Sequence, residues 1–253
     1  MKTIRRVARS LGLLVHLGWG MGLVAWYLGM CRLDANSARF RQVVRHWQRR
    51  SCAILGLRPR VFGQPPREGV MLVSNHVSWL DIPVLAAVVN PAFLSKAEIR
   101  RWPIVGLLAE KAGTLFIERG RHGQADTAVR ALASRLASGR SVLFFPEGTT
   151  TDGTRVRRFH GRLLAAAIRT EVEVQPVALC YRGESGVDTR LAFTERQGAF
   201  SVMWEVMGRR EPVVVDVHFL ESLDPGQTRS ELARHSQQAI ARTVENCNSG
   251  VEK

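Results

Sequence analysis

A histidine and an aspartate lie five residues apart in the segment SNHVSWLD, residues 74–81. His76 directly follows a short apolar run that is typical of a buried strand. A carboxylate that binds one ring nitrogen of a histidine keeps that nitrogen protonated and leaves the other free to accept a proton. His76 and Asp81 therefore suit a general base that activates an alcohol. The same spacing also arises when a histidine ends a strand and an aspartate caps the following helix, so the pair alone does not decide between the two interpretations.

Two further polar groups follow predicted strands. Arg119 ends the segment GTLFIER, residues 113–119, where its planar fork suits the binding of a phosphate. The alternative for Arg119 is a surface arginine that pairs with Glu118 or another acid. Glu147 follows the run SVLFF in a Pro-Glu-Gly turn, where it suits the orientation of an arginine or of an acceptor hydroxyl. A plain turn is the alternative there.

These residues need a sheet to position them. Apolar runs typical of strands occur at residues 70–74, 93–95, 114–118, 141–145, 174–181, 200–207 and 213–219. Helical spacing occurs between them at residues 83–89, 102–112, 125–138, 161–169 and 229–247. This order predicts an α/β fold, with a largely parallel mixed sheet covered by helices. Functional loops in such folds lie beyond the carboxyl ends of the strands, where His76, Arg119 and Glu147 are expected.

The composition indicates an anionic partner. The chain of 253 residues carries a formal net charge of +14, which suits nucleic acid, an anionic membrane surface or an acidic carrier protein. Cys31, Cys52, Cys180 and Cys247 are far apart in the sequence and form no CxxC pair. Neither a disulfide framework nor a zinc site is therefore expected, and a reducing cytoplasmic setting fits isolated thiols.

The basic charge is concentrated at the N-terminus. Residues 1–50 contain ten Lys and Arg against the single acid Asp34, and they flank an apolar stretch at residues 10–31 that is about long enough to cross a bilayer. A cleaved signal peptide or lipoprotein signal would require small residues before the cut, and Met30 is bulky. A spanning helix remains open. We favour a helix within one leaflet, followed by a basic amphipathic helix at residues 36–53. Residues that suit a membrane interface, together with the basic flanks, are Trp19, Trp26, Tyr27 and Trp47.

Four segments in this order resemble the glycerophospholipid acyltransferase family, which includes bacterial 1-acyl-glycerol-3-phosphate acyltransferases. They are NHVSWLD (75–81), GTLFIER (113–119), FPEGT (145–149) and VQPVAL (174–179), and the resemblance extends over about residues 70–181. It implies a glycerol-3-phosphate acyltransferase-like fold, with an N-terminal membrane-associated element at residues 1–57 and a catalytic domain at residues 58–253.

The resemblance also implies residue roles. His76 would deprotonate a lysolipid hydroxyl while Asp81 orients its ring, and Arg119 would bind the phosphate of the acceptor. The remaining residues that the family pattern implies for substrate binding are Asn75, Gly113, Phe116, Glu147, Gly148 and Thr149. The acyl donor would be acyl-CoA or acyl carrier protein as cosubstrate, with no cofactor and no metal. Direct attack on the thioester needs no covalent acyl-enzyme, so Ser78 is not required as a nucleophile.

The third segment departs from the family pattern. Members that form phosphatidate often read FPEGTR, whereas this chain has Thr150 in the run FPEGTTTDGTRVRRFHG. The TTTDG form resembles a branch that includes lyso-ornithine lipid acyltransferases. We predict acyl transfer to 1-acyl-glycerol-3-phosphate, giving phosphatidate, with Arg155, Arg157 and Arg158 as candidates for the missing charge. Transfer to lyso-ornithine lipid is the alternative.

Other functions fit the sequence less well. Nucleic-acid binding would explain the charge, but no RNP-like, zinc-finger or helix-turn-helix pattern occurs. A serine hydrolase would need a GxSxG turn, which the chain lacks. A catalytically silent membrane scaffold would not need a polar pair such as His76 and Asp81 at the end of a strand. We therefore expect a membrane enzyme at the cytoplasmic face of the inner membrane.

Overall fold

A twisted sheet organises the chain. The computed structural model describes residues 1–118, 124–184, 186–193 and 198–249, and within these residues the sheet has eight strands. Seven of them follow the order β1-β8-β6-β2-β5-β3-β4, while β7 (Gly186–Val187) pairs with the end of β6. The bounds of the seven are Leu57–Phe62 (β1), Met71–Ser74 (β2), Ala92–Lys96 (β3), Leu115–Ile117 (β4), Val142–Phe144 (β5), Val174–Gly183 (β6) and Val213–Phe219 (β8).

The strand directions create one edge at which several loops meet. Strands β6, β2, β5, β3 and β4 are mutually parallel, and β8 joins them antiparallel to β6. The carboxyl ends of the five parallel strands therefore lie on the same side of the sheet, which we call the catalytic edge. The predicted α/β class with a largely parallel mixed sheet is confirmed.

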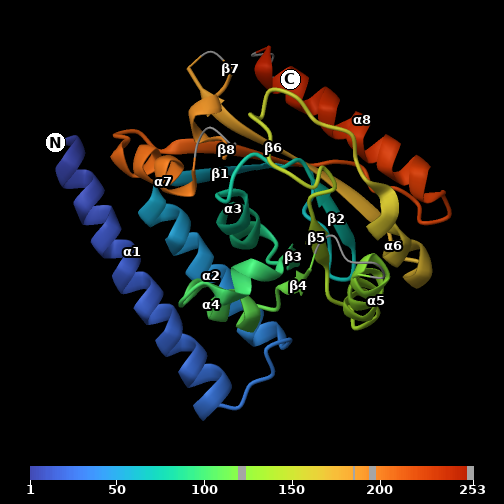
Figure 1. Cartoon of the computed structure of the whole chain (residues 1–253), viewed down its shortest axis with the longest axis horizontal. Helices are drawn as coiled ribbons and strands as arrows, with labels where there is room; N and C mark the ends of the chain where they lie inside the picture. The colour runs from blue at the N-terminus through green and yellow to red at the C-terminus, as the bar shows by residue number, and fades with distance from the viewer. Residues whose placement is uncertain (119–123, 185, 194–197, 250–253) are drawn as a thin grey trace.

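Helices cover both faces of the sheet (Figure 1). Along β2, Leu72 packs with one core cluster while Met71 and Val73 pack with the other, as the alternation of a strand requires. One face carries α2, α3 and α7, the other carries α5, α6 and α8, and α1 forms an outer layer beside α2 and α7. The helix bounds are Lys2–Val24 (α1), Ala38–Leu55 (α2), Asp81–Val88 (α3), Val105–Lys111 (α4), Gln124–Ala137 (α5), Ala165–Thr170 (α6), Ala199–Gly208 (α7) and Arg229–Asn248 (α8).

Two elements differ from the sequence prediction. Residues 200–207 were predicted to form a strand, yet they lie in the helix α7. Val202 and Val206, four residues apart, are buried in the core, whereas Phe200 and Trp204 face outward. A helical period of burial therefore overrides the strand preference of these apolar residues. Residues 57–62, where no strand was predicted, form β1 and pair in parallel with β8.

The cysteine prediction was wrong for one pair. Cys180 on β6 and Cys247 on α8 form a disulfide between residues 67 positions apart. The spacing in the sequence hides this pair, because only the packing of α8 on β6 brings the two side chains together. Cys31 and Cys52 are free.

The outer helix α1 is held along much of its length. His16 is buried against α2, where its Nε2 lies 3.0 Å from both the Trp47 carbonyl and the Ser51 hydroxyl. The rings of His16 and Trp47 stack with centroids 4.6 Å apart. Gly20 has no room for a side chain, because a Cβ there would meet the Trp47 ring at 2.9 Å. Trp47 was predicted to lie at a membrane interface, but its ring instead fills the contact between α1 and α2.

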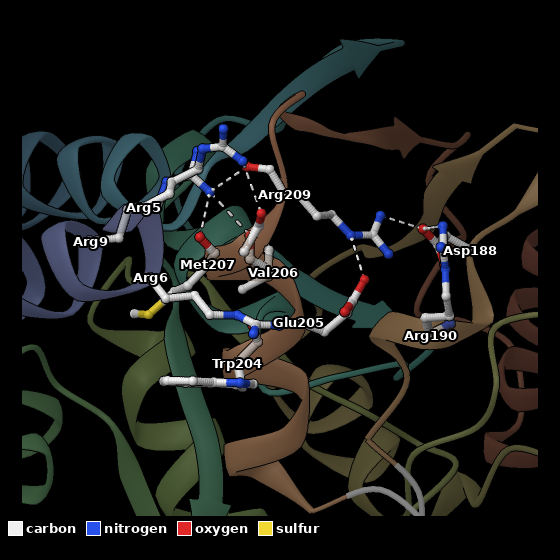
Figure 2. Close-up of polar contacts among 11 residues, drawn as sticks. Arg5, Arg6, Arg9, Asp188, Arg190, Trp204, Glu205, Val206, Met207 and Arg209 are labelled. Atoms are coloured by element: carbon white, nitrogen blue, oxygen red, sulfur yellow. Dashed lines mark hydrogen bonds and ion pairs between the residues drawn. The ribbon is translucent and has the colours of Figure 1, made fainter. Parts of the chain in front are cut away.

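Three arginines of α1 bind the carboxyl end of α7, as Figure 2 shows. Arg5 donates to the carbonyl of Gly208 at 3.0 Å, and Arg6 donates to that of Trp204 at 2.9 Å. Arg9 donates to three carbonyls, which belong to Val206, Met207 and Arg209. The last carbonyls of a helix lack partners within the helix, and cations are favourable there. These arginines were predicted to face lipid headgroups, and that prediction is corrected because protein carbonyls hold them.

Candidate active site

His76 and Asp81 meet at the catalytic edge. His76 lies two residues beyond β2, and Asp81 is the first residue of α3. The Nδ1 atom of His76 is 2.6 Å from Oδ2 of Asp81, whose side chain is fully buried. The His76 ring stacks on Phe145 with centroids 3.9 Å apart, and its side chain keeps 22% of its surface exposed. The ring is therefore fixed in orientation while one part of it stays accessible from outside.

The Asp81 carboxylate has several donors. Oδ2 also accepts hydrogen bonds from the backbone N–H groups of Val77 and Ser78, at 2.9 and 3.0 Å. Oδ1 accepts from the hydroxyl of Tyr181 on β6 at 2.6 Å. Burial, followed by the neighbouring Asp81 charge, raises the pKa of Tyr181 well above its ordinary value, so the phenol remains a donor. These three hydrogen bonds fix the position of the carboxylate that holds the His76 ring.

Glu147 joins two loops of the catalytic edge. Its Oε1 accepts from the backbone N–H of His76 at 2.9 Å, and its Oε2 accepts from that of Arg157 at 2.8 Å. Burial raises the pKa of Glu147, and the two backbone hydrogen bonds oppose this shift. Both carboxylate oxygens of Glu147 thus hold backbone N–H groups, and through them the residue positions His76. The predicted contact between Glu147 and substrate stays a prediction.

The TTTDG segment packs directly on the catalytic loop. The Thr151 N–H donates to the carbonyl of His76 at 2.8 Å. Gly153 has φ +82°, and a Cβ there would lie 3.1–3.4 Å from the side chains of Val187 and Val77. The hydroxyl of Thr150 donates to the carbonyl of Phe193. Thr150 thus has a structural contact at the position where phosphatidate-forming members of the family often carry an arginine.

Gly148 and Thr149 lie at the outer side of this turn. Both residues are exposed, and Gly148 adopts φ +72°, which few side chains tolerate. The Gly148 N–H donates to the carbonyl of Phe145 at 3.1 Å and closes the turn. Their predicted role in substrate binding stays a prediction, and their exposure next to the His76 loop is compatible with it.

Asn75 holds the loop to β6. The residue is 1% exposed. Its side-chain amide donates to the carbonyl of Leu179 at 3.0 Å and accepts from the Leu179 N–H at 2.8 Å. Asn75 therefore takes the place of a strand neighbour for β6 and positions the loop, and its predicted contact with substrate stays a prediction.

Gly113 also lies away from the catalytic edge. It precedes β4 and has φ +93°, and a Cβ there would meet the buried guanidinium of Arg140 at 2.7 Å. The NH2 group of Arg140 donates to the neighbouring Ala112 carbonyl at 2.5 Å. Gly113 stands at the amino end of its parallel strand and leaves room for Arg140, and its predicted role in substrate binding stays a prediction. Phe116 lies half-buried within β4, and Arg119 lies outside the described residues.

Sequence reasoning missed Tyr181. The residue ends a continuous apolar run, in which a tyrosine suggests core packing and nothing more. A signal was nevertheless present, since the hydroxyl of a buried tyrosine needs a polar partner. Among the described residues, one group of three side chains has metal-ligand chemistry, namely Cys180, His218 and Cys247. The two sulfur atoms of this group are joined in the disulfide, which leaves the His218 imidazole as the one available ligand of the three.

The arrangement suits proton transfer at the ring nitrogen of His76 that Asp81 does not hold. Asp81 holds Nδ1 of His76, which leaves Nε2 to accept a proton. Asp81 is occupied by three hydrogen bonds besides the one with His76. The site can therefore remove a proton from a hydroxyl that comes within hydrogen-bond distance of His76.

Comparisons with known proteins agree with this chemistry. Residues 59–180 match the family model described as Acyltransferase. The chain is 44% identical to a lyso-ornithine lipid O-acyltransferase of Pseudomonas aeruginosa over 243 residues, which cover 95% of this chain and 93% of that protein. It is 33% identical to a 1-acyl-sn-glycerol-3-phosphate acyltransferase of Neisseria gonorrhoeae over 68% of each chain.

A solved structure shares the fold. The acyltransferase PlsC from Thermotoga maritima, which acts on 1-acyl-sn-glycerophosphate, superposes over the full length of both chains with a TM-score of 0.67 at 24% identity. An identity of 44% over nearly the whole of a relative is enough to place this protein. The chain belongs to the acyltransferase family, and it is an acyltransferase.

Proposed function

We propose that the protein transfers a fatty acyl group from a thioester to the hydroxyl of a lysolipid. The contact of 2.6 Å between His76 and Asp81, with the ring partly exposed, is the observation that carries the mechanism. His76 takes the proton of the acceptor hydroxyl while the oxygen attacks the thioester carbonyl. The C–O bond forms, the C–S bond breaks, and the proton passes from His76 to the leaving thiolate. Asp81 stabilises the imidazolium that forms between these two steps.

We infer that lyso-ornithine lipid is the first acceptor to test. Three relatives of that name, from Pseudomonas aeruginosa, Rhizobium meliloti and Brucella abortus, match over 81–95% of this chain. The contact between Thr150 and Phe193 supports the inference, because no cation stands at position 150 to bind a phosphate. Lysophosphatidate, favoured by the sequence interpretation alone, is the second candidate and is supported by the Neisseria relative.

The donor in this proposal is an acyl thioester of coenzyme A or of acyl carrier protein. Either molecule presents the same thioester to His76 and differs only in the group that carries it. The exposed guanidinium groups near the third segment, at Arg155, Arg157 and Arg158, suit the anionic groups of both carriers.

We also propose that α1 lies in the plane of the membrane. Residues 2–30 form a helix that is long and apolar enough to cross a bilayer by length and composition. Its contacts with the rest of the chain favour the in-plane arrangement. The first turns of α1 are held to α7 through Arg9, and its later turns are held to α2 through His16. Its outward side chains form one apolar stripe, namely Ile4, Val7, Leu11, Leu14, Val15 and Trp19. Such a stripe beside a docked face suits one leaflet.

An acyl-transfer assay tests the function. Purified protein in detergent receives radiolabelled acyl-CoA or acyl carrier protein, with lyso-ornithine lipid and lysophosphatidate offered separately. We expect labelled ornithine lipid, and loss of product in the His76→Ala variant. Product from lysophosphatidate alone would reverse the choice of acceptor. A folded His76→Ala protein that keeps the wild-type rate would rule out the proposed base.

A further inference from the structure

Helix α7 presents an aromatic pair to its surroundings. Phe200 is 67% exposed and Trp204 is 39% exposed, and their rings stack with centroids 5.8 Å apart. The opposite side of the helix, with Val202 and Val206, is fully buried. Large apolar side chains that are exposed next to each other carry an unfavourable hydration free energy, which an apolar environment would relieve.

The aromatic pair is attached firmly to α1. The Arg6 guanidinium lies 4.6 Å from the centroid of the Trp204 ring, and its Nε donates to the Trp204 carbonyl. Arg5 and Arg9 hold the carbonyls that follow in α7 (Figure 2). The pair therefore keeps a fixed position beside the first turns of the helix whose outward stripe is apolar.

A further exposed aromatic side chain lies at the catalytic edge. Phe193 is 37% exposed and lies a few residues before α7 in the sequence. Its N–H donates to the carbonyl of Val77 at 2.8 Å, and its own carbonyl accepts from Thr150. Phe193 thus presents an exposed ring beside the loop that carries His76.

We propose that α7 is a second bilayer-contacting element, in which Phe200 and Trp204 enter the headgroup region of an anionic membrane beside α1. This inference rests on the membrane position proposed for α1, and it adds the catalytic domain itself to the contact. Aromatic side chains are favourable at this depth of a bilayer. The contact holds the catalytic edge at the surface in which a lysolipid acceptor lies.

Two observations favour a bilayer over a protein partner. The aromatic pair lies beside the first turns of α1, because the Arg6 guanidinium stacks on the Trp204 ring. The charged side chains near the pair include the bases Lys2, Arg6, Arg190 and Arg210 and the acids Glu184, Glu205 and Glu211, and the whole chain carries +14. Basic residues around an apolar surface complement anionic headgroups.

Vesicle binding tests the proposal. Full-length wild-type protein and the Phe200→Ser variant are mixed with vesicles of phosphatidylcholine and phosphatidylglycerol, and the bound fraction is measured by flotation. We expect the vesicle partition coefficient of Phe200→Ser to be about tenfold below that of the wild type, because an exposed phenyl ring no longer enters the membrane. Phe62→Ser is the matched control: Phe62 is 40% exposed and ends β1 on the side of the sheet away from the catalytic edge.

The outcomes separate this proposal from the one on which it rests. Wild-type protein that does not float would contradict the membrane position of α1. Normal binding of the wild type and of Phe200→Ser would overturn the role of α7 alone. A change in oligomeric mass of Phe200→Ser, with unchanged vesicle binding, would instead identify a subunit contact and would equally overturn the proposal.

A depth measurement gives a second test that does not depend on loss of binding. Phe200→Cys is introduced in a Cys31→Ser background, because Cys31 is the exposed free thiol of the described residues. An environment-sensitive fluorophore is attached at position 200. We expect a blue shift on addition of vesicles and quenching by spin-labelled lipids. An unshifted, unquenched signal on bound protein would place α7 outside the bilayer.

Discussion

At the catalytic edge two carboxylates collect backbone N–H groups, whereas at the contact between α1 and α7 three guanidiniums collect backbone carbonyls. Asp81 and Glu147 together accept four N–H groups from loops that follow β2 and β5. Arg5, Arg6 and Arg9 together donate to five carbonyls at the end of α7. In both regions charged side chains bind backbone groups near the ends of regular elements.

The two regions differ in what a lost side chain would expose. Asp81 is fully buried, and its hydrogen bonds set the orientation of the reacting ring. The three arginines are partly exposed, and water can replace part of what they donate. We therefore expect substitutions at the catalytic edge to act mainly on rate and those at the α1–α7 contact to act mainly on stability.

The largest effect is expected for Asp81→Asn. The amide cannot accept from all the present donors and favours the wrong tautomer of His76, so kcat should fall by about 10³- to 10⁴-fold, as in other His-Asp sites. The measurement is kcat with saturating acceptor, together with a thermal unfolding curve. Asp152→Asn is the control, because Asp152 is exposed and accepts hydrogen bonds from Thr154 within its own turn. A folded Asp81→Asn enzyme with more than about a tenth of the wild-type kcat would contradict the assigned role.

Arg9→Met tests the other half of the comparison. The variant keeps much of the apolar stem but removes the donor to three carbonyls, so the free energy of unfolding should fall by about 2 kcal/mol. Denaturant unfolding in detergent measures this change. Arg210→Met serves as control, since its side chain is 86% exposed and only loosely paired with Glu211. Equal stability of both variants would show that the bonds to α7 contribute nothing measurable.

The sequence predicted the two regions unequally. His76 and Asp81 stand five residues apart between a strand and a helix, so local patterns are enough to place them together. Arg9 and Val206 are 197 residues apart, and only the packing of α1 on α7 joins them. The basic residues were for this reason assigned to lipid headgroups. Long-range contacts of this kind leave no periodic trace in the sequence.

The same limit applies within the catalytic edge. The predicted family segments singled out Asn75, Gly113 and Glu147, and the structure adds contacts for each of them that the segments did not indicate. The actual partners are a strand backbone for Asn75, the Arg140 guanidinium beside Gly113, and two loop N–H groups for Glu147. Each of the three residues has a partner at least 27 positions away in the sequence. The family segments therefore marked these residues but did not show which groups they contact.

The stability of the α1–α7 contact also depends on pH, through the ion pairs of Asp188 beside it. Arg209, whose carbonyl accepts from Arg9, also binds Asp188 together with Arg190. Burial alone would raise the pKa of Asp188, but the hydrogen bonds from Arg190 and Arg209 outweigh it and lower the pKa to about 2. Because this value lies below that of the unfolded chain, the stabilisation is present above pH of about 4 and is lost as the pH falls toward 2.

The Asp188→Asn variant measures this contribution. At pH above about 4 the wild type should exceed the variant by about 2 kcal/mol in unfolding free energy, and about half of this pH-dependent term should be lost by pH 3. Urea unfolding of both proteins at several pH values provides the test. A difference that does not change with pH would mean that Asp188 is not ionised in the way its partners require.

Tyr181→Phe is expected to have the smallest effect, and it decides whether the catalytic edge also depends on a distant residue. The change removes one hydroxyl from Oδ1 of Asp81 and leaves the ring packing in place. Loss of one hydrogen bond to a charged group corresponds to a fall in kcat of about tenfold, with KM unchanged because Tyr181 is fully buried and does not reach substrate.

The pH profile separates positioning from simple loss of packing. Without the hydrogen bond from Tyr181, more of the negative charge of the Asp81 carboxylate acts on His76 and stabilises its protonated ring. The pH at which the rate rises should therefore shift upward in Tyr181→Phe, whereas a merely loosened core would lower the rate at every pH without moving the profile. Tyr27→Phe is the matched control, since Tyr27 is the other tyrosine of the chain and lies at the end of the first helix. A Tyr181→Phe profile that superposes on the wild type would confine the catalytic machinery to the two short loops that the sequence already indicated.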